Sequence, residues 1–332
     1  ITVLKQHGWK DGVLRYPTER DLLDNWKGIL YRNNNDIDRL GKYPLTDGEM
    51  TQIIEQIETL RTPLALNSFV NGRTVSITRD NKEDVAHFGK EVSLYIYDRK
   101  EIAGGKSTYQ IAQQPVYPAK NKMLNSRRGD LVLLINGMPL IHIELKKSGI
   151  PVSQATNQIE KYAHEGVFTG LFRLVQIFVA MNPDDAVYFA NPGVDKFNPS
   201  YYFHWADYNN EPICGGQNPG KDEWKLFIGG TSGTAGLLSI PMAHQLIGFY
   251  TIADSADGCL KVLRSYQYIA ANAISDVVRK CDWEQRPATP GRPGGYVWHT
   301  TGSGKTMTSF KSAQLIADSH DADKVVFLMD RI

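Results

Sequence analysis

The stretch Asp130-Leu-Val-Leu-Leu-Ile-Asn-Gly-Met-Pro-Leu-Ile-His-Ile-Glu-Leu-Lys146 decides the fold of this chain and holds its main candidate site. The apolar runs 131–135 and 140–143 are typical of buried strands. Asn136-Gly137, between the two runs, favours the positive φ angles of a hairpin turn. The stretch therefore predicts a β-hairpin that carries two acids and a lysine towards its open end.

The register of this hairpin decides whether its charged groups can meet, because successive side chains of a strand point to opposite faces. A two-residue turn with regular pairing would place the two acids on opposite faces. We therefore predict a three-residue loop, Ile135 to Gly137, closed by a pair between Leu134 and Met138, with the glycine left-handed at a bulge. The side chains that then share one face are those of Asp130, Glu144 and Lys146.

The two acids predict a metal site. Hard divalent cations prefer oxygen ligands, and Mg²⁺ is usually held by one or two carboxylates together with water and phosphate oxygens. We therefore expect Asp130 and Glu144 to bind Mg²⁺, and Lys146 to orient the attacking water and offset charge on a scissile phosphate. The alternative is a hairpin whose edge charges are merely solvated, because triplets of this kind are common.

A helix is predicted directly after the hairpin, from Pro151 to His164, with the proline near its start. Gln158 and Tyr162 lie one turn apart on one face of it. Alone, this spacing is that of an ordinary amphipathic helix. After an acid-x-Lys strand, it resembles the extended active site of RecB-like PD-(D/E)xK nucleases, in which the Gln and Tyr help to orient the metal site and the DNA backbone. The candidate catalytic residues are therefore Asp130, Glu144, Lys146, Gln158 and Tyr162.

A second motif, at residues 294–306, is typical of a phosphate-binding loop. It runs from a short apolar strand through a Gly-rich turn into a helix. Backbone N–H groups of such a loop bind phosphate, its lysine reaches the β- and γ-phosphates, and its last hydroxyl is offered to Mg²⁺. His299 replaces the usual first glycine, a departure familiar in superfamily-two helicases; a chance Gly/Ser loop is the alternative. The residues expected to bind ATP are Thr301, Gly302, Ser303, Gly304, Lys305 and Thr306.

The segments around this loop extend the nucleotide site. Upstream, Arg264-Ser-Tyr-Gln267 resembles the adenine-recognising element of those helicases, because the Gln267 amide offers a donor and an acceptor together. Downstream, we predict a helix over 307–318 and a buried parallel strand over 324–331. The sequence stops before any acidic Walker B strand or arginine finger, so we expect it to bind ATP weakly and to hydrolyse little by itself.

Taken together, these motifs resemble the restriction and motor (R) subunit of type I restriction-modification enzymes, over nearly the whole chain from about Lys5. The residues that carry the resemblance are Asn136-Gly-Met-Pro-Leu, Glu144-Leu-Lys-Lys, Asn157-Gln-Ile with Tyr162, Phe189-Ala-Asn-Pro, Arg264 with Tyr266-Gln267, the loop from Gly295 to Thr306, and Asp330-Arg331.

The resemblance implies a type I site-specific deoxyribonuclease that is dependent on Mg²⁺ and ATP. It implies translocation of double-stranded DNA and cleavage away from the recognition site, in a complex with methyltransferase (M) and specificity (S) subunits in a bacterial or archaeal cytoplasm. Target recognition is not expected in this chain. Two alternatives stay open: a RecB-type repair nuclease-ATPase, and a non-catalytic DNA- and nucleotide-binding module.

One departure from the family concerns an upstream acid. The nuclease of this family usually begins with a helix that bears a further glutamate. The stretch Leu4 to Trp9 resembles the end of that helix, so we expect any such acid to precede Ile1. Glu19 is expected to be structural, at the start of another helix that Thr18 caps.

Composition is compatible with this interpretation without deciding it. The chain has 332 residues, 42% of them hydrophobic and 22% charged, which suits two domains. We expect no signal peptide, and because no run approaches the ~20 apolar residues that span a bilayer, we expect no membrane role. Cys214, Cys259 and Cys281 form no CxxC pair, which argues against a zinc site or a disulfide framework and fits a reducing cytoplasm.

Local charge is more informative than the net charge of +1. Basic side chains gather around the predicted metal site in the sequence, where they predict contacts with DNA phosphates. The alternative is an ordinary solvated surface. These basic residues are Lys120, Lys122, Arg127, Arg128, Lys146 and Lys147.

The predicted fold class is α/β, with a PD-(D/E)xK (RecB-like) nuclease domain followed by the start of a superfamily-two RecA-like P-loop domain. The nuclease domain is predicted at 1–205, a connecting segment at 206–258 and the N-terminal part of the ATPase/translocase domain at 259–332. Further elements are predicted at 46–60 (helix) and at 92–97, 109–116, 174–181 and 186–190 (strands).

Overall fold

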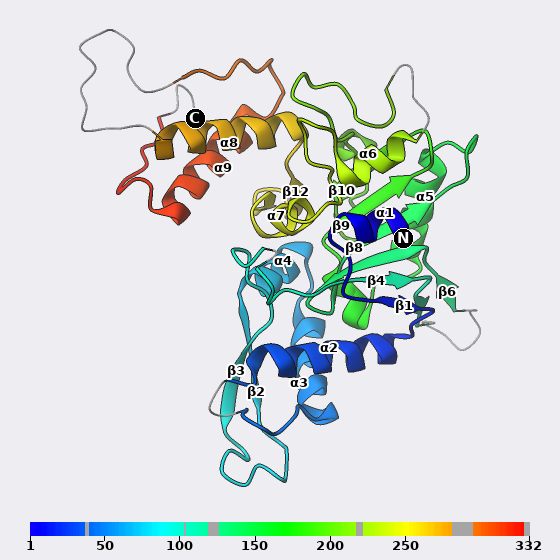
Figure 1. Ribbon diagram of the computed structural model, residues 1–332, viewed down its shortest axis with the longest axis vertical. Helices are drawn as coiled ribbons and strands as arrows, with labels where there is room; N and C mark the ends of the chain where they lie inside the picture. The colour runs from blue at the N-terminus through cyan, green and yellow to red at the C-terminus, as the bar shows by residue number, and fades with distance from the viewer. Residues whose placement is uncertain (37–39, 103, 119–125, 217–221, 281–294, 329–332) are drawn as a thin grey trace. The chain divides into compact units, whose positions relative to one another are not determined.

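A mixed β-sheet forms the centre of the larger of the two parts of the chain in the computed structural model (Figure 1). The structure describes residues 1–36, 40–102, 104–118, 126–216, 222–280 and 295–328. In this part of the chain the sheet has six strands, in the order β1-β4-β7-β8-β9-β10. β4, β7, β8 are antiparallel neighbours, β9 is parallel to β8, and β1 and β10 form the edges. The strands are β1 (Val13–Arg15), β4 (Tyr109–Gln113), β7 (Leu131–Ile135), β8 (Met138–Leu145), β9 (Ile177–Met181) and β10 (Ala186–Ala190).

Helix α5 (Ser153–His164) connects β8 to β9, as a parallel pair of strands requires a crossover. Its buried side chains pack against one face of β9 and β10, and the side chains on the other face of these two strands are buried as well. The core cluster on this side consists of Ala155, Ile159, Val175, Phe178, Ala180, Val187 and Phe189. The crossover brings α5 past the end of β8, so that Gln158 and Tyr162 lie beside the candidate catalytic residues of the hairpin.

Helix α2 (Glu19–Asn34) begins as the sequence predicts, at a capping box. The Thr18 side chain accepts from the N–H of Asp21, and the Asp21 carboxylate accepts from the N–H of Thr18. Further along the helix, the amides of Asn25 and Gln110 exchange two hydrogen bonds of 2.9 and 3.0 Å. These bonds fix α2 beside strand β4.

The turn between β7 and β8 has two residues, so the predicted three-residue loop is wrong. Ile135 pairs with Met138, and Asn136 and Gly137 have φ angles of 52° and 83°. Both angles are positive, as in a type I′ turn, whose twist matches that of the flanking strands. The Asn136 carboxamide also accepts from the N–H of Thr108, at 2.8 Å, which ties the tight turn to β4.

The extra residue that the prediction assigned to the loop lies within β8 instead. Leu133 pairs with Ile141 and Leu134 with Pro139, so Leu140 has no partner of its own and forms a β-bulge. Proline cannot donate a ladder hydrogen bond, and a bulge is one of the places in a sheet that tolerates it. The bulge shifts the side-chain alternation by one residue, as the predicted loop would have done.

Most other predicted elements of this region are present with small differences at their ends. The predicted helix at 46–60 is α3 (Asp47–Thr59), the strand at 92–97 is β3 (Glu91–Tyr95), and those at 109–116, 174–181 and 186–190 correspond to β4, β9 and β10. The remaining elements are α1 (Thr2–Gln6), α4 (Pro63–Asn71), β2 (Thr74–Thr78), β5 (Val116–Tyr117), β6 (Arg127–Arg128), η1 (Gly170–Leu174), η2 (Pro199–Tyr201), α6 (Glu223–Gly229), α7 (Met242–Gly248), β11 (Thr251–Asp254) and β12 (Cys259–Val262).

The chain divides into two compact units. Unit 1 comprises Ile1–Trp205 and Pro212–Val262, and unit 2 comprises Ala206–Glu211 and Leu263–Ile332. Most of the segment predicted to connect two domains, 206–258, therefore falls in unit 1, where it contains α6, α7 and β11. Its apolar side chains explain this, because several of them are buried, Phe227 completely.

The described residues of unit 2 form two helices, α8 (Ser265–Lys280) and α9 (Lys305–Ser319), which pack side by side. The predicted helix at 307–318 lies within α9. The predicted strand at 324–331 is wrong in its described part, because 324–328 form no strand and Leu328 is 94% exposed. A strand needs a neighbour for its backbone hydrogen bonds, and the described residues of unit 2 contain none. No helix in the described ranges is long and apolar enough to cross a membrane.

Candidate active site at the open end of the β7–β8 hairpin

Asp130 and Glu144 lie together at the end of the hairpin opposite its turn. Because Leu131 pairs with Ile143, the next pair outward sets the two acids opposite each other on one face. Glu144 is only 2% exposed. Burial, and then the negative charge of Glu144, raise the pKa of Asp130, although the N–H of Leu145 donates to its carboxylate at 2.7 Å. Two carboxylates held this close favour a bound cation, which would offset their repulsion.

The donor set fits Mg²⁺. Among the described residues, the Oε2 atom of Glu144 is buried without a hydrogen-bond partner, which leaves a carboxylate oxygen available as a ligand. Within the same residues, no group of three or more His, Cys, Asp or Glu side chains could hold a metal ion, and the carboxyl groups that meet at this end of the hairpin are those of Asp130 and Glu144. Mg²⁺ is commonly bound in this way and keeps several water molecules.

One chain of hydrogen bonds links Lys146, Gln158 and Tyr162 to Glu144. The Lys146 ammonium lies 3.5 Å from Oε1 of Glu144 and donates to Oε1 of Gln158 at 2.5 Å. Gln158 donates to the Tyr162 hydroxyl at 2.6 Å, and this hydroxyl donates to the carbonyl of Arg128 at 3.0 Å. The helical spacing of the Gln and Tyr makes this possible, because both face β8 from one side of α5. The structure therefore brings together all five predicted catalytic residues.

Two residues at this site were missed by the sequence analysis, His142 and Tyr117. His142 is fully buried, with Nε2 3.5 Å from Oε2 of Glu144 and Nδ1 2.8 Å from the Tyr117 hydroxyl. The strand alternation gave a signal for His142, because it lies two residues before Glu144 and shares its face. Tyr117, on β5, offered none, since only the fold brings it to the hairpin.

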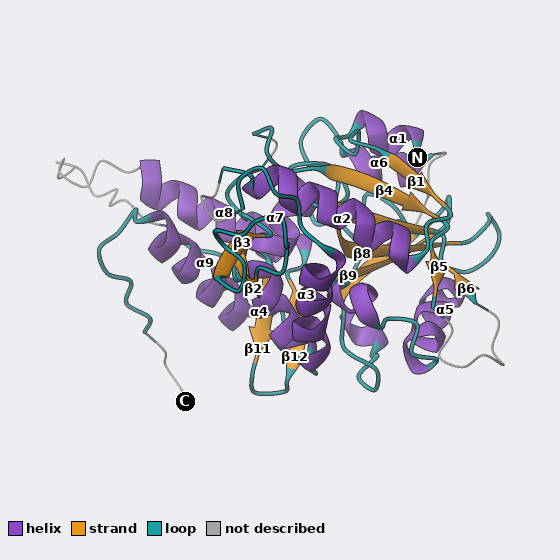
Figure 2. Ribbon diagram, turned by 90° about the horizontal axis from the view of Figure 1, so that it is seen from below, coloured by secondary structure: helices purple, strands orange, loops and turns teal. Residues whose placement is uncertain are grey.

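The basic residues predicted around the metal site differ in their surroundings. The Arg127 guanidinium forms two hydrogen bonds of 2.9 Å with Glu165, which raise its pKa and neutralise much of its charge. Arg128 and Lys147 are exposed. Lys120 and Lys122 lie outside the described residues. In Figure 2, β5 and β6 lie next to α5, so Arg127 and Arg128 are close to the same end of the helix as the site.

Glu19 is not part of this site, in agreement with its predicted structural role. Its carboxylate accepts from the N–H of Leu171 at 2.7 Å, at the start of η1. Burial raises the pKa of Glu19, and this hydrogen bond opposes the rise.

The phosphate-loop residues lie at the start of α9 in unit 2. Gly302 and Gly304 have φ angles of 79° and 80°, which glycine adopts without strain. The Lys305 ammonium donates to the carbonyls of Thr300 and His299, at 3.1 and 3.4 Å. The loop residues Thr301 and Thr306 are exposed, and Ser303 is half-buried.

Gln267 contacts this loop directly. Its Oε1 accepts from the N–H of Arg264 at 2.9 Å, and its Nε2 donates to the carbonyls of Ser303 and Gly304, at 3.1 and 3.2 Å. Tyr266 also donates to the Ser303 carbonyl, at 2.8 Å. The amide that was predicted to read adenine therefore supports the phosphate loop in this structure.

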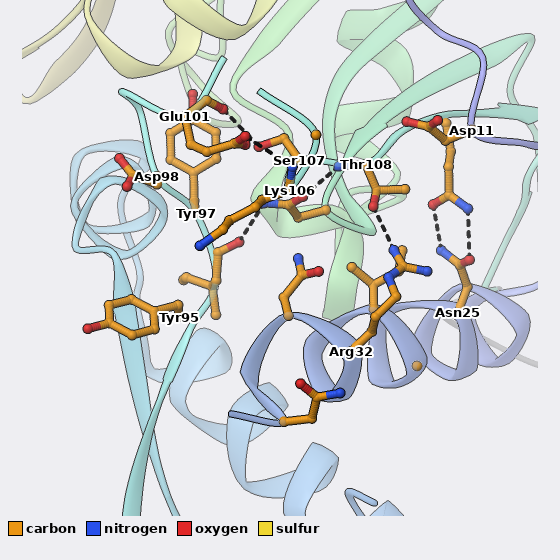
Figure 3. Close-up of a pocket in the computed structure, with 18 of the residues that line it drawn as sticks. Asp11, Asn25, Arg32, Tyr95, Tyr97, Asp98, Glu101, Lys106, Ser107 and Thr108 are labelled. Carbon is orange, nitrogen blue, oxygen red and sulfur yellow. Dashed lines mark hydrogen bonds between the residues drawn. The ribbon is translucent and has the colours of Figure 1, made fainter. Parts of the chain in front are cut away.

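A large polar pocket of about 1140 Å³ lies elsewhere in unit 1, beside α2 and the loop before β4. Polar side chains of its wall pair with one another: Asn25 with Gln110 and, as Figure 3 shows, Arg32 with Thr108. Asn136, from the hairpin turn, also lines it. The pocket is thus at the turn end of β7, away from Asp130, and its mixture of acids and bases points to no single ligand.

Comparison with known proteins identifies two matching families. Residues 2–197 match the family of the type I restriction enzyme R protein N terminus. Residues 266–332 match the SWI2/SNF2 ATPase family. The first match contains the whole β7–β8 hairpin and α5, and the second begins just after Ser265 and includes the phosphate loop.

Curated relatives agree with these matches. The chain is 32% identical to the type I restriction enzyme SsaAORF53P endonuclease subunit of Staphylococcus saprophyticus, over 99% of the chain and 30% of that relative. It is 29% identical to the type I restriction enzyme EcoprrI endonuclease subunit of Escherichia coli, over 64% of the chain and 62% of that relative. The chain therefore spans about 30% of the length of the staphylococcal relative.

Proposed function

This chain belongs to the family of the type I restriction enzyme R protein N terminus, and on that premise we propose that unit 1 is a Mg²⁺-dependent endonuclease domain of the PD-(D/E)xK class. Its substrate is double-stranded DNA. The observation that carries the proposal is the convergence of Asp130, Glu144 and Lys146 on one face, joined by Gln158 and Tyr162 from the next helix.

The strand order supports this class of nuclease. Three antiparallel strands (β4, β7 and β8) are followed by a crossover helix, α5, and by β9, which is parallel to β8. This layout puts a pair of acids at the open end of a hairpin and a helix beside it. An antiparallel sheet with solvated edge charges would leave Glu144 exposed, whereas it is buried.

The chain's own residues account for the chemistry as follows. Asp130 and Glu144 would hold Mg²⁺, which lowers the pKa of a bound water molecule and polarises the scissile phosphate. Lys146 is held beside Glu144 by Gln158, so its ammonium is in place to offset negative charge that develops on the phosphate. Tyr162 links Gln158 to the carbonyl of Arg128, and so holds the Gln158 amide that positions the Lys146 ammonium.

Unit 2 supplies the beginning of an ATP-driven motor in this proposal. Lys305 and the glycine loop would bind the phosphates of ATP. Gln267 and Tyr266 support the loop through hydrogen bonds to the Ser303 carbonyl. In the complete enzyme the motor translocates DNA, working with M and S subunits, and cleavage occurs away from the recognition site.

The test is cleavage of circular plasmid DNA by the full-length subunit mixed with its cognate M and S subunits, Mg²⁺ and ATP. Asp130→Asn and Glu144→Gln should each reduce cleavage to background. Asp195→Asn, which changes an exposed acid of the same unit, should leave it unchanged. Cleavage at the wild-type rate by a folded Glu144→Gln enzyme would rule out this site as the nuclease centre.

A further inference from the structure

A buried imidazole lies directly beside the candidate metal ligand Glu144. His142 is fully buried, and its Nε2 atom is 3.5 Å from Oε2 of Glu144. Among the described residues, neither of these two atoms has another hydrogen-bond partner. Leaving a buried polar atom without a partner is unfavourable, because the atom loses its bonds to water and gains none in the fold. A small rotation of either side chain would let Nε2–H donate to this oxygen, whose second lone pair stays available for a cation.

The other ring nitrogen of His142 is held by a tyrosine. The hydroxyl of Tyr117 lies 2.8 Å from Nδ1. Burial raises the pKa of Tyr117 well above its usual value, so its hydroxyl keeps its proton and can donate it to Nδ1. In the neutral imidazole, Nε2 then carries the hydrogen and points it at the carboxylate. The opposite tautomer would set a lone pair against the Glu144 oxygen, which electrostatics disfavours.

The surroundings hold both rings in place. Tyr117 packs edge-on against Phe172, with ring centroids 4.6 Å apart, and His142 packs edge-on against Phe168 at 5.4 Å. Gly129 passes so close to them that a Cβ atom there would lie 2.5 Å from the Tyr117 oxygen and 3.1 Å from Cε1 of His142. The backbone next to Asp130 is thus packed against the tyrosine–histidine pair.

We propose that His142 is a positioning residue for the metal site: its Nε2–H group orients the Glu144 carboxylate towards the cation, and Tyr117 selects the tautomer that does so. The inference rests on the proposed nuclease function. His142 reaches the reaction only through Glu144, because it is closed off from solvent. Partners of this kind behind metal ligands typically change metal affinity by 10–100-fold when they are removed.

The first test measures binding of Mn²⁺ to the full chain by electron paramagnetic resonance of the free ion. Glu144→Gln should abolish the site. His142→Phe, which keeps a flat ring without a donor, should weaken binding by about 10–100-fold. His142→Gln, whose amide can donate near the position of Nε2, should bind within a few-fold of wild type. Phe168→Leu, which changes only the packing around the imidazole, should bind as wild type does.

These variants separate positioning from packing. A His142→Phe chain with a native circular dichroism spectrum and wild-type affinity for Mn²⁺ would overturn the inference and leave the proposed nuclease intact. A wild-type chain without a Mn²⁺ site that depends on Glu144 would overturn both. Tyr117→Phe, which removes only the hydroxyl, should weaken Mn²⁺ binding less than His142→Phe does.

The second test does not need the metal. Nitrogen-15 NMR of the histidine-labelled chain reports which ring nitrogen of His142 bears hydrogen, with the signal assigned by its loss in His142→Gln. The expected result is a hydrogen on Nε2 in wild type and a mixture of tautomers in Tyr117→Phe. A hydrogen on Nδ1 alone in the wild-type chain would contradict the inference.

Discussion

Asp130 occupies a position that suits ion binding at a cost to stability. Its carboxyl is partly buried and faces Glu144, and both conditions raise its pKa. An acid with a raised pKa in the folded state favours folding in its protonated form and opposes it once ionised. The pairing of Asp130 with Glu144 could be predicted from the sequence. Asp130 directly precedes β7 and Glu144 lies near the end of β8, so the two side chains meet if the alternation of side chains sets them on the same face of the hairpin.

This cost gives a prediction for stability against pH. Stability should fall as the pH rises from the unfolded value, near 3.8, through the raised pKa of folded Asp130, and the loss persists at neutral pH. Asp130→Asn removes the charge, so in a buffer with a chelator it should melt higher than wild type at pH 7.5 and no higher at pH 3. A gain of 1 kcal/mol raises the melting temperature of a unit of this size by about 2–4 °C.

The measurement is a pair of thermal melts at each pH. Asp195→Asn, at an exposed acid, is the matched control and should not change the melting temperature at either pH. An advantage of Asp130→Asn that is greater at pH 3 than at pH 7.5 would show that the sign of the pKa shift is wrong.

At the scale of elements, the hairpin shows what a sequence pattern can and cannot decide. The side-chain alternation required one extra residue between the two acids, and that requirement is met. The location of the extra residue depended on contacts with residues that are distant in the sequence. The Asn136 carboxamide accepts a hydrogen bond from the N–H of Thr108, and Gly137 lies against Trp26. These contacts favour a tight turn and move the irregularity to Leu140, next to a proline that cannot donate a hydrogen bond.

The turn gives a prediction about glycine. Gly137 and Gly89 both have positive φ angles, 83° and 75°. A Cβ atom at Gly137 would lie 2.9 Å from Cα of Trp26, whereas one at Gly89 would meet nothing within 4 Å. Gly89→Ala should therefore lower the free energy of unfolding by about 1–2 kcal/mol through backbone strain alone. Gly137→Ala should lower it by about 1–3 kcal/mol more, because of overpacking.

Denaturant titrations of the two variants test this account of the turn. Equal losses of stability would mean that contact with Trp26 does not constrain the turn.

At the scale of the whole molecule, the sequence analysis was weaker for unit 2 than for unit 1. In unit 1 both strands of the β7–β8 hairpin have neighbouring strands in the sheet, so the apolar runs of the sequence do form strands there. In unit 2 the apolar residues at 324–328 are exposed and form no strand, although their composition is that of a buried one. A parallel strand is specified by its neighbours as much as by its own residues, and the described part of unit 2 provides none.

The division of labour between the units gives an asymmetric prediction for the complete enzyme. Lys305→Ala removes the charge that would hold the β- and γ-phosphates, so ATP hydrolysis and translocation should be lost. Cleavage should be lost too, because we propose that the nuclease cuts only after the motor has translocated DNA and stopped. Glu144→Gln should lose cleavage and keep ATP hydrolysis.

ATPase and plasmid-cleavage assays on the same preparations measure both activities of the Lys305→Ala and Glu144→Gln enzymes. Cleavage of circular DNA at the normal rate by a Lys305→Ala enzyme without ATPase activity would favour an autonomous nuclease.

The central claim, that Asp130 and Glu144 together hold the catalytic cation, is tested most directly by anomalous X-ray scattering from crystals of the chain soaked in Mn²⁺. We predict an anomalous peak beside the carboxylates of Asp130 and Glu144, the residues that would hold the cation. The peak should be absent from Glu144→Gln crystals of the same form. Wild-type crystals with no peak between these carboxylates at a saturating Mn²⁺ concentration, or a peak that persists unchanged in Glu144→Gln, would contradict the claim.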